Sequence, residues 1–446
     1  MKHLPILISA LLFSTTATTQ IDVGGMVKNK VNQRVEQKTN EAIDKTLDKT
    51  EESAKDAAKG NKKKDKKGGD DTNNGSTETP SGNQEGGSNS NGEGVASKAT
   101  LKTYGKFDFV PGEKVMVTDN FSQVAVGDFP ADWNTNSGGE IVTAEGKEGH
   151  WLMLSKEGVF IPDYITELPE NFTMQFELIC NEGFSFYSSA MGITFVPTNN
   201  RGKLNDFSRF SHPPFALRLH VHPEDAGGSQ GWSKVEVWDG QGESLMHNEI
   251  VTSKFDEAKS SHVKVSIWRQ KQRLRVYLND EKIYDIPRAF DATSKYNTVV
   301  FNVDGMHKPE DRYLISNITL AQGAPDTRNK LITEGKFVTH GILFDSGSDR
   351  IKAESYGALK DIANVLIENP TVKVKIIGHT DSDGEDANNL ELSKKRAAAV
   401  KETLSKEFAI DPSRMETDGK GESQPADKND TPVGKANNRR VEFVKL

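Results

Sequence analysis

Two oppositely charged side chains near the end of the sequence could together bind a zwitterion. Asp381 lies in the segment GHTDSDG, and Arg396 lies in the segment NLELSKKRAAAV, about two turns into a predicted helix. If the loop folds back over the helix, the carboxylate and the guanidinium face one pocket. The carboxylate can accept hydrogen bonds from a ligand ammonium, and the guanidinium fork can bind a ligand carboxylate in bidentate fashion. The predicted chemistry is recognition of a free amino-acid group.

The charged pair belongs to a larger set of motifs within residues 330–446. The segments ILFDSGSDRI, GHTDSDG, NLELSKKRAAAV and NNRRVEF follow one another in this order, with GKGESQP before the last one. In order and spacing they resemble the OmpA-like (OmpA/Pal/MotB-type) peptidoglycan-binding domain of Gram-negative envelope proteins. The resemblance implies that the ligand is the diaminopimelate end of the peptidoglycan stem peptide, and that Asp381 and Arg396 hold it.

The resemblance adds further residues to the expected ligand site. Phe344 and Asp345 match a strand-end pair that lines the pocket in the family. Asn389 matches the residue that opens the second helix; helix capping is an alternative role, compatible with ligand contact. Thr380 is expected to offer a hydroxyl or backbone contact. The family usually has an aromatic residue before this asparagine, and here that position is Asn388.

Three more positions and one histidine each have two interpretations. Leu392 is expected to form an apolar wall of the pocket or to pack in the core. Either Arg439 or Arg440 reaches the ligand carboxylate, or the arginine forms a structural ion pair with a nearby carboxylate. His379 ends a predicted strand, and His340 is the only other histidine in residues 330–446. A metal or acid–base role is therefore less favoured for His379 than a structural, hydrogen-bonded one.

The acidic loop TDSDGEDANN raises the question of a cation site. Asp383, Glu385 and Asp386 supply carboxylates, but the loop lacks the ligand spacing of an EF-hand. We interpret it as a solvated acidic loop. The sequence predicts neither a metal site nor a cofactor.

The elements predicted for residues 330–446 alternate between strand and helix. Ala353–Glu368 and Leu390–Lys406 place apolar residues at helical spacing, and other runs alternate with a period of two. The predicted strands are 335–345, 371–377, 414–418 and 440–444. This order predicts an α/β domain in which the helices pack on a sheet.

Residues 101–325 have a different pattern, in which short alternating runs recur between turn residues. The clearest pair is HVKVSIWRQ followed by RLRVYLND, which ends in a predicted turn at Asn279-Asp280. The predicted strands are 172–180, 190–196, 216–221, 234–238, 262–268, 274–278, 298–303 and 313–320. The pattern predicts an all-β sandwich and resembles the concanavalin-A-like or laminin-G-like jelly roll. The expected fold is thus multidomain, with an all-β jelly-roll sandwich before an α/β OmpA-like domain.

Three segments of different composition precede the sandwich. Residues 1–20 combine a basic start, an apolar run and small residues, which predicts a secretory signal peptide. In residues 21–60, apolar residues recur at multiples of four from Val27 to Leu47. This predicts an amphipathic helical segment that joins a partner helix, lies on a membrane surface or stays solvated. Residues 61–100 have the composition of a low-complexity flexible linker.

The overall composition excludes several classes of protein. The net charge of −8 argues against a nucleic-acid-binding protein. The single cysteine, Cys180, excludes an internal disulfide framework and a cysteine zinc site. The sequence contains no apolar run of transmembrane length. We therefore expect an exported protein of a Gram-negative bacterium, located in the periplasm or associated with the outer membrane through a partner or the 21–60 helix.

The function predicted from these features is non-catalytic. The C-terminal domain anchors the protein to peptidoglycan, and the sandwich binds a glycan or an envelope protein. The alternative is an envelope glycan hydrolase in which the jelly roll is catalytic. Residues 101–325 contain no E-x-D-x-x-E series, and the run Glu236–Asp239 has the wrong spacing. Trp133, Trp232 or Trp238 could stack on a sugar if exposed, although burial in a core is the commoner fate. A groove with two facing carboxylates would favour the hydrolase.

Overall fold

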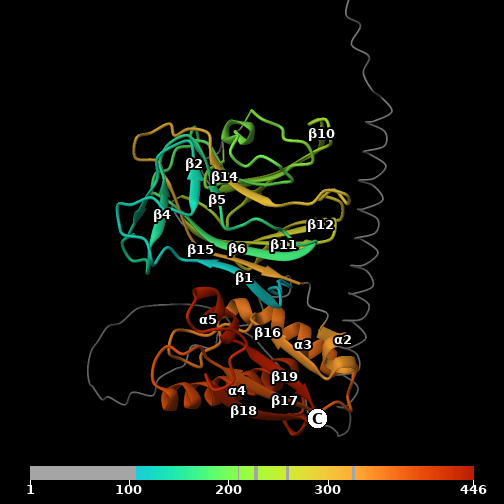
Figure 1. Cartoon of the computed structure of the whole chain (residues 1–446). Helices are drawn as coiled ribbons and strands as arrows, with labels where there is room; N and C mark the ends of the chain where they lie inside the picture. Colours follow the sequence, from blue (N-terminus) through green and yellow to red (C-terminus); the bar gives the residue numbers. More distant parts are fainter. Residues whose placement is uncertain (1–106, 209, 226–229, 258–260, 324–326) are drawn as a thin grey trace, which may run out of the picture. The chain divides into compact units, whose positions relative to one another are not determined.

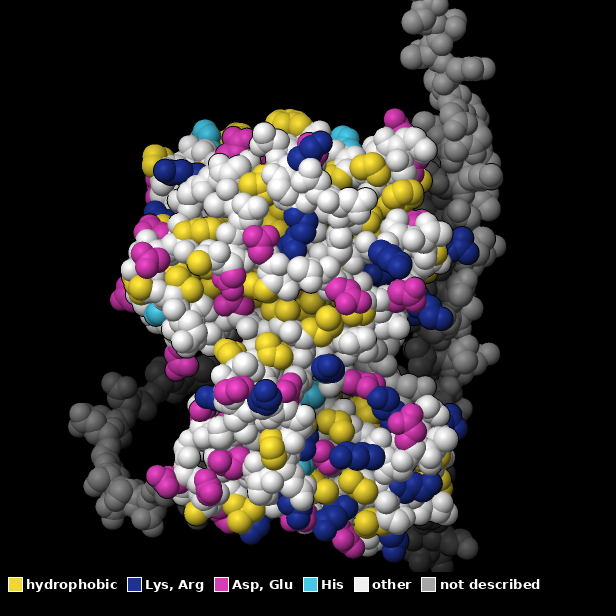
Figure 2. Space-filling view, viewed as in Figure 1, with side chains coloured by type: hydrophobic (Ala, Val, Ile, Leu, Met, Phe, Trp, Pro, Cys, Tyr) yellow, Lys and Arg dark blue, Asp and Glu magenta, His cyan; other side chains and the backbone are white. Residues whose placement is uncertain are grey.

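The computed structural model describes residues 107–446, apart from residues 209, 226–229, 258–260 and 324–326 (Figure 1). The predicted signal peptide (1–20), amphipathic segment (21–60) and linker (61–100) lie outside the described residues. Within the described part, no helix is both long and apolar enough to cross a membrane. On the face shown in Figure 2, basic and acidic side chains are interspersed rather than gathered in one basic patch.

The middle of the chain contains two antiparallel sheets, and the first has eight strands. Its order is β13-β12-β11-β6-β15-β4-β3, and β1 and β4 pair with different ends of β15. The strands are β1 (Lys114–Asp119), β3 (Glu140–Val142), β4 (Trp151–Leu154), β6 (Asn171–Cys180), β11 (His262–Gln270), β12 (Arg273–Leu278), β13 (Glu281–Ile286) and β15 (Tyr313–Gln322). In β11, Val263 and Val265 are buried in the core, so Lys264 lies on the outer face of the sheet.

The second sheet has seven strands in the order β10-β9-β8-β7-β14-β5-β2. They are β2 (Trp133–Thr135), β5 (Gly158–Pro162), β7 (Met191–Val196), β8 (Leu217–His222), β9 (Gly231–Trp238), β10 (Ser244–Thr252) and β14 (Thr298–Val303), with the 3-10 helix η2 (Leu204–Phe207) between β7 and β8. Every pairing within this sheet is antiparallel.

The two sheets pack face to face around one apolar core, as the alternating pattern predicts. Phe172 on β6 meets Phe195 on β7 with ring centroids 5.7 Å apart. Phe176, four residues further along β6 and on the same face, meets Phe301 on β14 at 5.4 Å. These cross-sheet contacts follow from the period of two along each strand.

Four of the strands that the sequence did not predict have weak patterns for physical reasons. Strands β2 and β3 have three residues each, too few to show alternation. Strand β5 is buried along its whole length, so its two faces do not differ in polarity. Strand β10 lies at an edge of its sheet, and most of its side chains are exposed or half-buried.

The C-terminal domain is a four-stranded mixed sheet with helices, as the alternation of periods predicts. The order is β16-β19-β17-β18, and only β17 and β18 are parallel. The strands are β16 (Lys336–Thr339), β17 (Val374–His379), β18 (Met415–Gly421) and β19 (Val441–Lys445). The helical elements are α2 (Thr327–Asn329), η3 (Lys330–Glu334), η4 (Ala353–Ser355), α3 (Tyr356–Glu368), α4 (Asp386–Phe408), η5 (Pro412–Arg414) and α5 (Pro432–Asn438). Leu359 of α3 and Val400 of α4 share one apolar core with Ile376 and Phe443 of the sheet.

The strand predicted to run to Asp345 ends at Thr339, so that prediction is wrong beyond this residue. Past Thr339 the chain leaves the sheet, and the Leu343 amide donates to the Ser355 hydroxyl at 2.8 Å. Phe344 makes only an isolated bridge. The backbone of this segment pairs with residues 350–352 and with the Ser355 hydroxyl rather than with a strand of the sheet, and the segment forms a wall of the cavity described below.

The chain segment around β1 links the sandwich to the C-terminal domain. Phe109 packs edge-on against Tyr277 on the outer face of the eight-stranded sheet, with centroids 5.3 Å apart, and belongs to the apolar cluster of the C-terminal domain. Asn437 of α5 accepts a hydrogen bond from the Val115 amide at 2.9 Å and donates to the Val115 carbonyl at 3.1 Å. These contacts bring α5 next to the outer face of the sheet.

Candidate functional site

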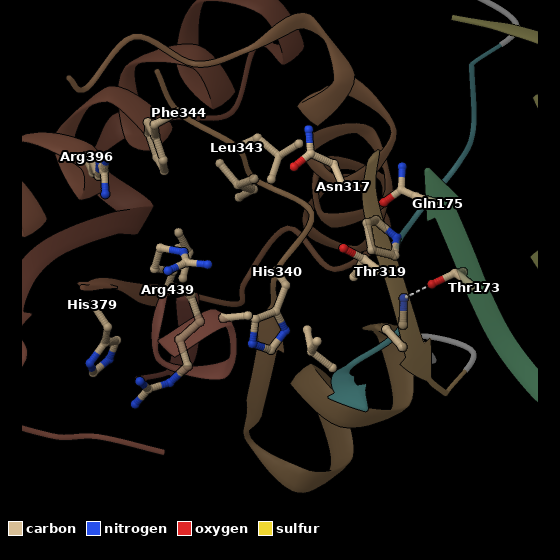
Figure 3. Close-up of a pocket in the computed structure, with 18 of the residues that line it drawn as sticks. Thr173, Gln175, Asn317, Thr319, His340, Leu343, Phe344, His379, Arg396 and Arg439 are labelled. Carbon is tan, nitrogen blue, oxygen red and sulfur yellow. Dashed lines mark hydrogen bonds between the residues drawn. The ribbon is translucent and has the colours of Figure 1, made fainter. Parts of the chain in front are cut away.

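A cavity of about 300 Å³ lies between the eight-stranded sheet and the C-terminal domain (Figure 3). This volume is at the lower end of ordinary small-molecule sites and suits a group of amino-acid size. From the C-terminal domain the polar and aromatic lining residues are His340, Phe344, His379, Arg396, Arg439 and Arg440. The cavity therefore contains four of the residues that the sequence placed in the ligand site: Phe344, Arg396, Arg439 and Arg440.

Arg396 is fixed by the wall formed after β16. Its Nε donates to the Ser348 carbonyl at 2.9 Å, and its Nη2 donates to the Asp345 carbonyl at 3.3 Å. The guanidinium carbon lies 4.9 Å from the centroid of the Phe344 ring. Burial lowers the pKa of Arg396, and the charge of Asp381 opposes that effect. Arginine nevertheless stays protonated at neutral pH, so the site holds a partly desolvated cation.

Asp381 lies two residues past β17 and is 7% exposed. Its Oδ1 accepts the Asp383 amide at 3.2 Å, and its Oδ2 accepts a hydrogen bond from Arg439 Nη1. The Arg439 side chain is 50% exposed and lines the cavity, whereas Asp381 lies behind it and is not a lining residue. The structure thus joins Asp381 to Arg439 directly, and places Arg396 close enough for its charge to act on Asp381.

Asn389 holds the loop that carries Asp381. Helix α4 begins at Asp386 with Glu385 as its N-cap, so Asn389 lies inside the first turn, and the capping role is wrong. The Asn389 Nδ2 group instead donates to the Asp381 carbonyl at 3.3 Å, the Asp383 carbonyl at 3.1 Å and Glu422 Oε2 at 2.7 Å. The side chain is a positioning group for the loop and does not line the cavity.

Arg440 lines the cavity but is occupied by a structural ion pair. Its Nε and Nη2 donate to Glu442 Oε1 at 3.0 and 2.8 Å, and Lys336 Nζ donates to the same carboxylate at 2.7 Å. Burial alone would raise the pKa of Glu442, but the surrounding His379, Lys336 and Arg440 hold it well below its ordinary value. His379 Nε2 lies 3.5 Å from Glu442 Oε1 and forms no hydrogen bond, so the hydrogen-bonded role expected for it is replaced by a looser charge contact.

Glu442→Gln is expected to lower the free energy of unfolding by about 3 kcal/mol at neutral pH, because it leaves the buried Arg440 without a charged partner. The depressed pKa of Glu442 means that this stabilisation is present above the unfolded pKa of about 4.3 and is lost as pH falls toward the folded pKa. Urea denaturation of both proteins should therefore give curves that converge as pH falls. The exposed Glu416→Gln on β18 is the control, and a pH-independent difference for Glu442→Gln would contradict the assignment.

The remaining predicted residues lie beside the cavity rather than in its wall. Thr380 is buried, its amide donates to the Gly421 carbonyl at 3.0 Å, and its hydroxyl has no partner in the described structure. Leu392 is half-buried and lies outside the apolar clusters. The Asp345 carboxylate pairs with Arg350, so Asp345 reaches the site through its backbone carbonyl on Arg396.

The opposite wall of the cavity comes from the sandwich, which sequence reasoning did not anticipate. Figure 3 shows Thr173, Gln175, Asn317 and Thr319 facing the cavity from the side opposite Arg396 and His379. The polar lining residues from the sandwich are Thr173, Gln175, Glu177, Lys264, Asn317 and Thr319, on β6, β11 and β15. The alternation along β6 indicates that Thr173, Gln175 and Glu177 face away from the core. The neighbouring residues in the sequence do not indicate which part of the protein these side chains face.

A second cavity, of about 690 Å³, lies on the outer face of the seven-stranded sheet. Tyr187 and Phe210 line it and are 77% and 81% exposed. Its polar lining side chains include Arg218, His220, Lys234, Glu236 and Asp304. Of the three tryptophans considered from the sequence, Trp133 and Trp238 are buried, whereas Trp232 is half-buried and lines this cavity.

Charge in the second cavity centres on Glu236. His220 Nε2 lies 2.9 Å from Glu236 Oε2, and Lys234 Nζ lies 3.3 Å from Oε1. The hydrogen bond from His220, together with Lys234, lowers the pKa of Glu236 to about 2, and burial lowers the pKa of His220 to about 4. At neutral pH the cavity therefore holds an ionised carboxylate that accepts from a neutral imidazole.

Comparison with known proteins identifies relatives of the C-terminal part. Residues 343–439 match the model of the OmpA family. The chain is 44% identical over 101 residues to outer membrane porin F of Pseudomonas fluorescens, covering 23% of this chain and 31% of that protein. It is 41% identical over 105 residues to the probable lipoprotein YiaD of Escherichia coli, covering 24% and 48%. The chain thus spans less than half the length of these curated relatives.

Solved structures are similar over about a quarter of the chain. The peptidoglycan-associated lipoprotein from Burkholderia pseudomallei is 31% identical, with 23% of this chain and 86% of that chain covered and a TM-score of 0.22. The cell wall anchor of the T6SS from Pseudomonas aeruginosa is 28% identical, with 25% and 80% covered and a TM-score of 0.23.

Proposed function

Residues 343–439 form an OmpA family domain, and from this premise we propose that the chain is a non-catalytic envelope protein that anchors to peptidoglycan. The proposed ligand is the free amino-acid end of diaminopimelate in the stem peptide. The names of two relatives, an outer membrane porin and a peptidoglycan-associated lipoprotein, support a location in the cell envelope.

The observation that carries this proposal is the state of Arg396. It lines the cavity, it is partly desolvated, and among the described residues it makes no ion pair. Two of its donors are already used by backbone carbonyls, which fixes the plane of the guanidinium. A ligand carboxylate that enters the cavity supplies the missing counter-charge.

The ammonium of the same ligand requires an acceptor close to Arg396. Asp381 is the proposed acceptor, because a carboxylate has about four lone-pair sites and the structure uses two of them. Arg439 contacts Asp381 and is half exposed, so it can move with the ligand and add a second donor to its carboxylate. Asp381 and Arg396 would then hold the two ends of one zwitterion.

The direct test is co-sedimentation of the purified chain with peptidoglycan sacculi. We expect the protein to pellet with intact sacculi and to be released by an excess of a synthetic stem tripeptide that ends in diaminopimelate. Release by soluble peptide-free glycan strands, but not by the tripeptide, would show that the peptides are not the ligand of the C-terminal domain.

For the sandwich we propose a glycan ligand in the second cavity. Two exposed aromatic rings, Tyr187 and Phe210, line this cavity together with charged and polar side chains. An aromatic face can stack on the apolar face of a sugar, while the polar lining side chains form hydrogen bonds with the sugar hydroxyls. The glycan is favoured over a protein partner because the cavity is concave and mostly polar.

Tyr187→Ala is expected to weaken glycan binding by about tenfold, since it removes one stacking face. A glycan array probed with the full chain would identify the ligand, and titration would compare the variant with Leu245→Ala. Leu245 is exposed on the edge strand β10 and does not line the cavity. Equal loss in both variants, or binding to a protein but to no glycan, would contradict the proposal.

The low pKa of Glu236 limits its role in the hydrolase alternative: Glu236 could be the ionised carboxylate of such a site but not its acid. Glu236 and Asp304 both line the second cavity, so two carboxylates are present. A glycosidase needs one carboxyl group that holds a proton near neutral pH, and with a pKa of about 2 Glu236 cannot be that group. Release of reducing sugars by the wild-type chain that Glu236→Gln abolishes would revive the enzyme.

A further inference from the structure

Each wall of the first cavity has one charged lining residue that forms no ion pair among the described residues. The charged lining residues, histidines apart, are Glu177, Lys264, Arg396, Arg439 and Arg440. Three of them have partners: Glu177 meets His262 at 3.2 Å, Arg439 meets Asp381, and Arg440 meets Glu442. Among the described residues, only Lys264 and Arg396 of this set make no ion pair. One belongs to the sandwich and the other to the C-terminal domain.

Lys264 has an acidic residue directly across the sheet and yet does not pair with it. Glu177 on β6 is its cross-strand partner in the register. Neighbours in this position are close enough to form a salt bridge, but the Glu177 carboxylate lies against His262 instead. The Lys264 side chain is therefore left directed at the cavity that it lines. Burial lowers the pKa of Lys264, and the charges of Glu354 and Glu177 oppose that effect without forming an ion pair with its ammonium.

The groups around Lys264 suit a polar ligand rather than an apolar one. Gln175 and Asn317 present side-chain amides on the same wall (Figure 3). Asn317 lies at an irregularity in the pairing of β15 with β6 and has a φ of 53°, a left-handed conformation that is uncommon outside glycine. A bulge of this kind redirects side chains, and here it directs an amide toward the cavity.

We propose that Lys264 is a second anion-binding group of this cavity and that it contacts a carboxylate other than the one held by Arg396. This inference rests on the proposed function. In a stem peptide that ends at diaminopimelate, this residue carries two carboxylates, one at its free amino-acid end and one at the end joined to the peptide. The sandwich would thus contribute one side of the peptidoglycan site. It would bind the second carboxylate, while the C-terminal domain binds the zwitterion.

The test uses a synthetic stem tripeptide that ends in diaminopimelate, and an analogue amidated only at the carboxyl group on the peptide-linked side. Isothermal titration of the full chain measures both. We expect Lys264→Met to bind the tripeptide about tenfold more weakly, the loss of one charge-assisted contact. The same variant should bind the amidated analogue as the wild type does, because the contact is already missing there. Lys264→Arg should retain most of the affinity.

The control is Lys271→Met, which removes an exposed lysine in the turn after β11 and outside the cavity. Thermal denaturation of Lys264→Met should show an unchanged or higher midpoint, because the variant removes a desolvated, unpaired charge. Two results would overturn the inference: unchanged binding of the tripeptide, or an equal loss for tripeptide and analogue, which indicates general charge attraction. If Arg396→Ala weakens binding while Lys264→Met does not, this inference fails and the proposed function stands; if neither does, both fail.

Discussion

Arg396→Ala is expected to weaken binding of the full chain to peptidoglycan by about 30-fold or more. The variant removes the guanidinium that the Ser348 and Asp345 carbonyls hold over Phe344. Losing one partner of a desolvated charge pair costs about 2–5 kcal/mol. Titration with the stem tripeptide measures the change, and the fold is checked by circular dichroism.

The design allows the loss to be assigned to the ligand carboxylate. Lys395 is the residue before Arg396 on α4, and its side chain is exposed and contacts Glu391. Lys395→Ala therefore removes one positive charge next to the site without changing the site itself. This control should bind as the wild type does. A tripeptide amidated at the free amino-acid end should bind wild type and Arg396→Ala equally weakly. If the amidated peptide still distinguishes them, Arg396 does not contact that carboxylate.

Asp381→Asn is expected to produce a loss of similar size through the other end of the ligand. The substitution keeps the shape of the side chain and removes the charge that faces the ammonium, so about 30-fold is again expected. A tripeptide acetylated at the free amine should bind the variant and the wild type equally. The loop should remain in place, because Asn389 holds it through the Asp381 and Asp383 carbonyls rather than the Asp381 carboxylate.

Asp383→Asn is the matched control for this loop. Asp383 is exposed and pairs with Lys435 at 2.6 Å, so the variant removes an equal charge two residues away. We expect less than a threefold change, as is usual for an exposed ion pair. If both asparagine variants lose affinity equally, general attraction by the acidic loop explains binding, and the specific role of Asp381 is wrong.

The sequence predicted the secondary structure best where burial differs between the two faces of an element. Strand β11 and helix α3 each have one core face, and their periods of two and of about 3.6 are visible in the residues themselves. Strand β5, buried on both faces, and the edge strand β10 carry no such contrast. The segment after Thr339 was predicted to continue the strand, but the chain leaves the sheet there and the Leu343 amide donates to the Ser355 hydroxyl.

Site residues were predicted from motifs, and motifs report which residues are near in sequence rather than which atoms meet. Arg439 and Arg440 are adjacent and chemically identical, and only the structure shows that Arg440 is paired with Glu442 while Arg439 reaches Asp381. Asn389 was expected at the helix start because it matches the residue that opens this helix in the family, with helix capping as an alternative role. Helix α4 begins one turn earlier, at Asp386, so Asn389 lies within the helix and its side chain holds the loop that carries Asp381.

Local patterns and motifs were sufficient to indicate a β-rich middle region, an α/β end and a pair of charges suited to a zwitterion. The strand and helix periods lie within single elements, and the two charges lie only 15 positions apart. The second wall of the cavity was decided by tertiary contacts alone. Val115 and Asn437 are 322 positions apart, and their hydrogen bonds help to place β6, β11 and β15 opposite Arg396. The periodicity of the sequence does not predict this contact, because the contact depends on how the surfaces of the sandwich and the C-terminal domain fit together.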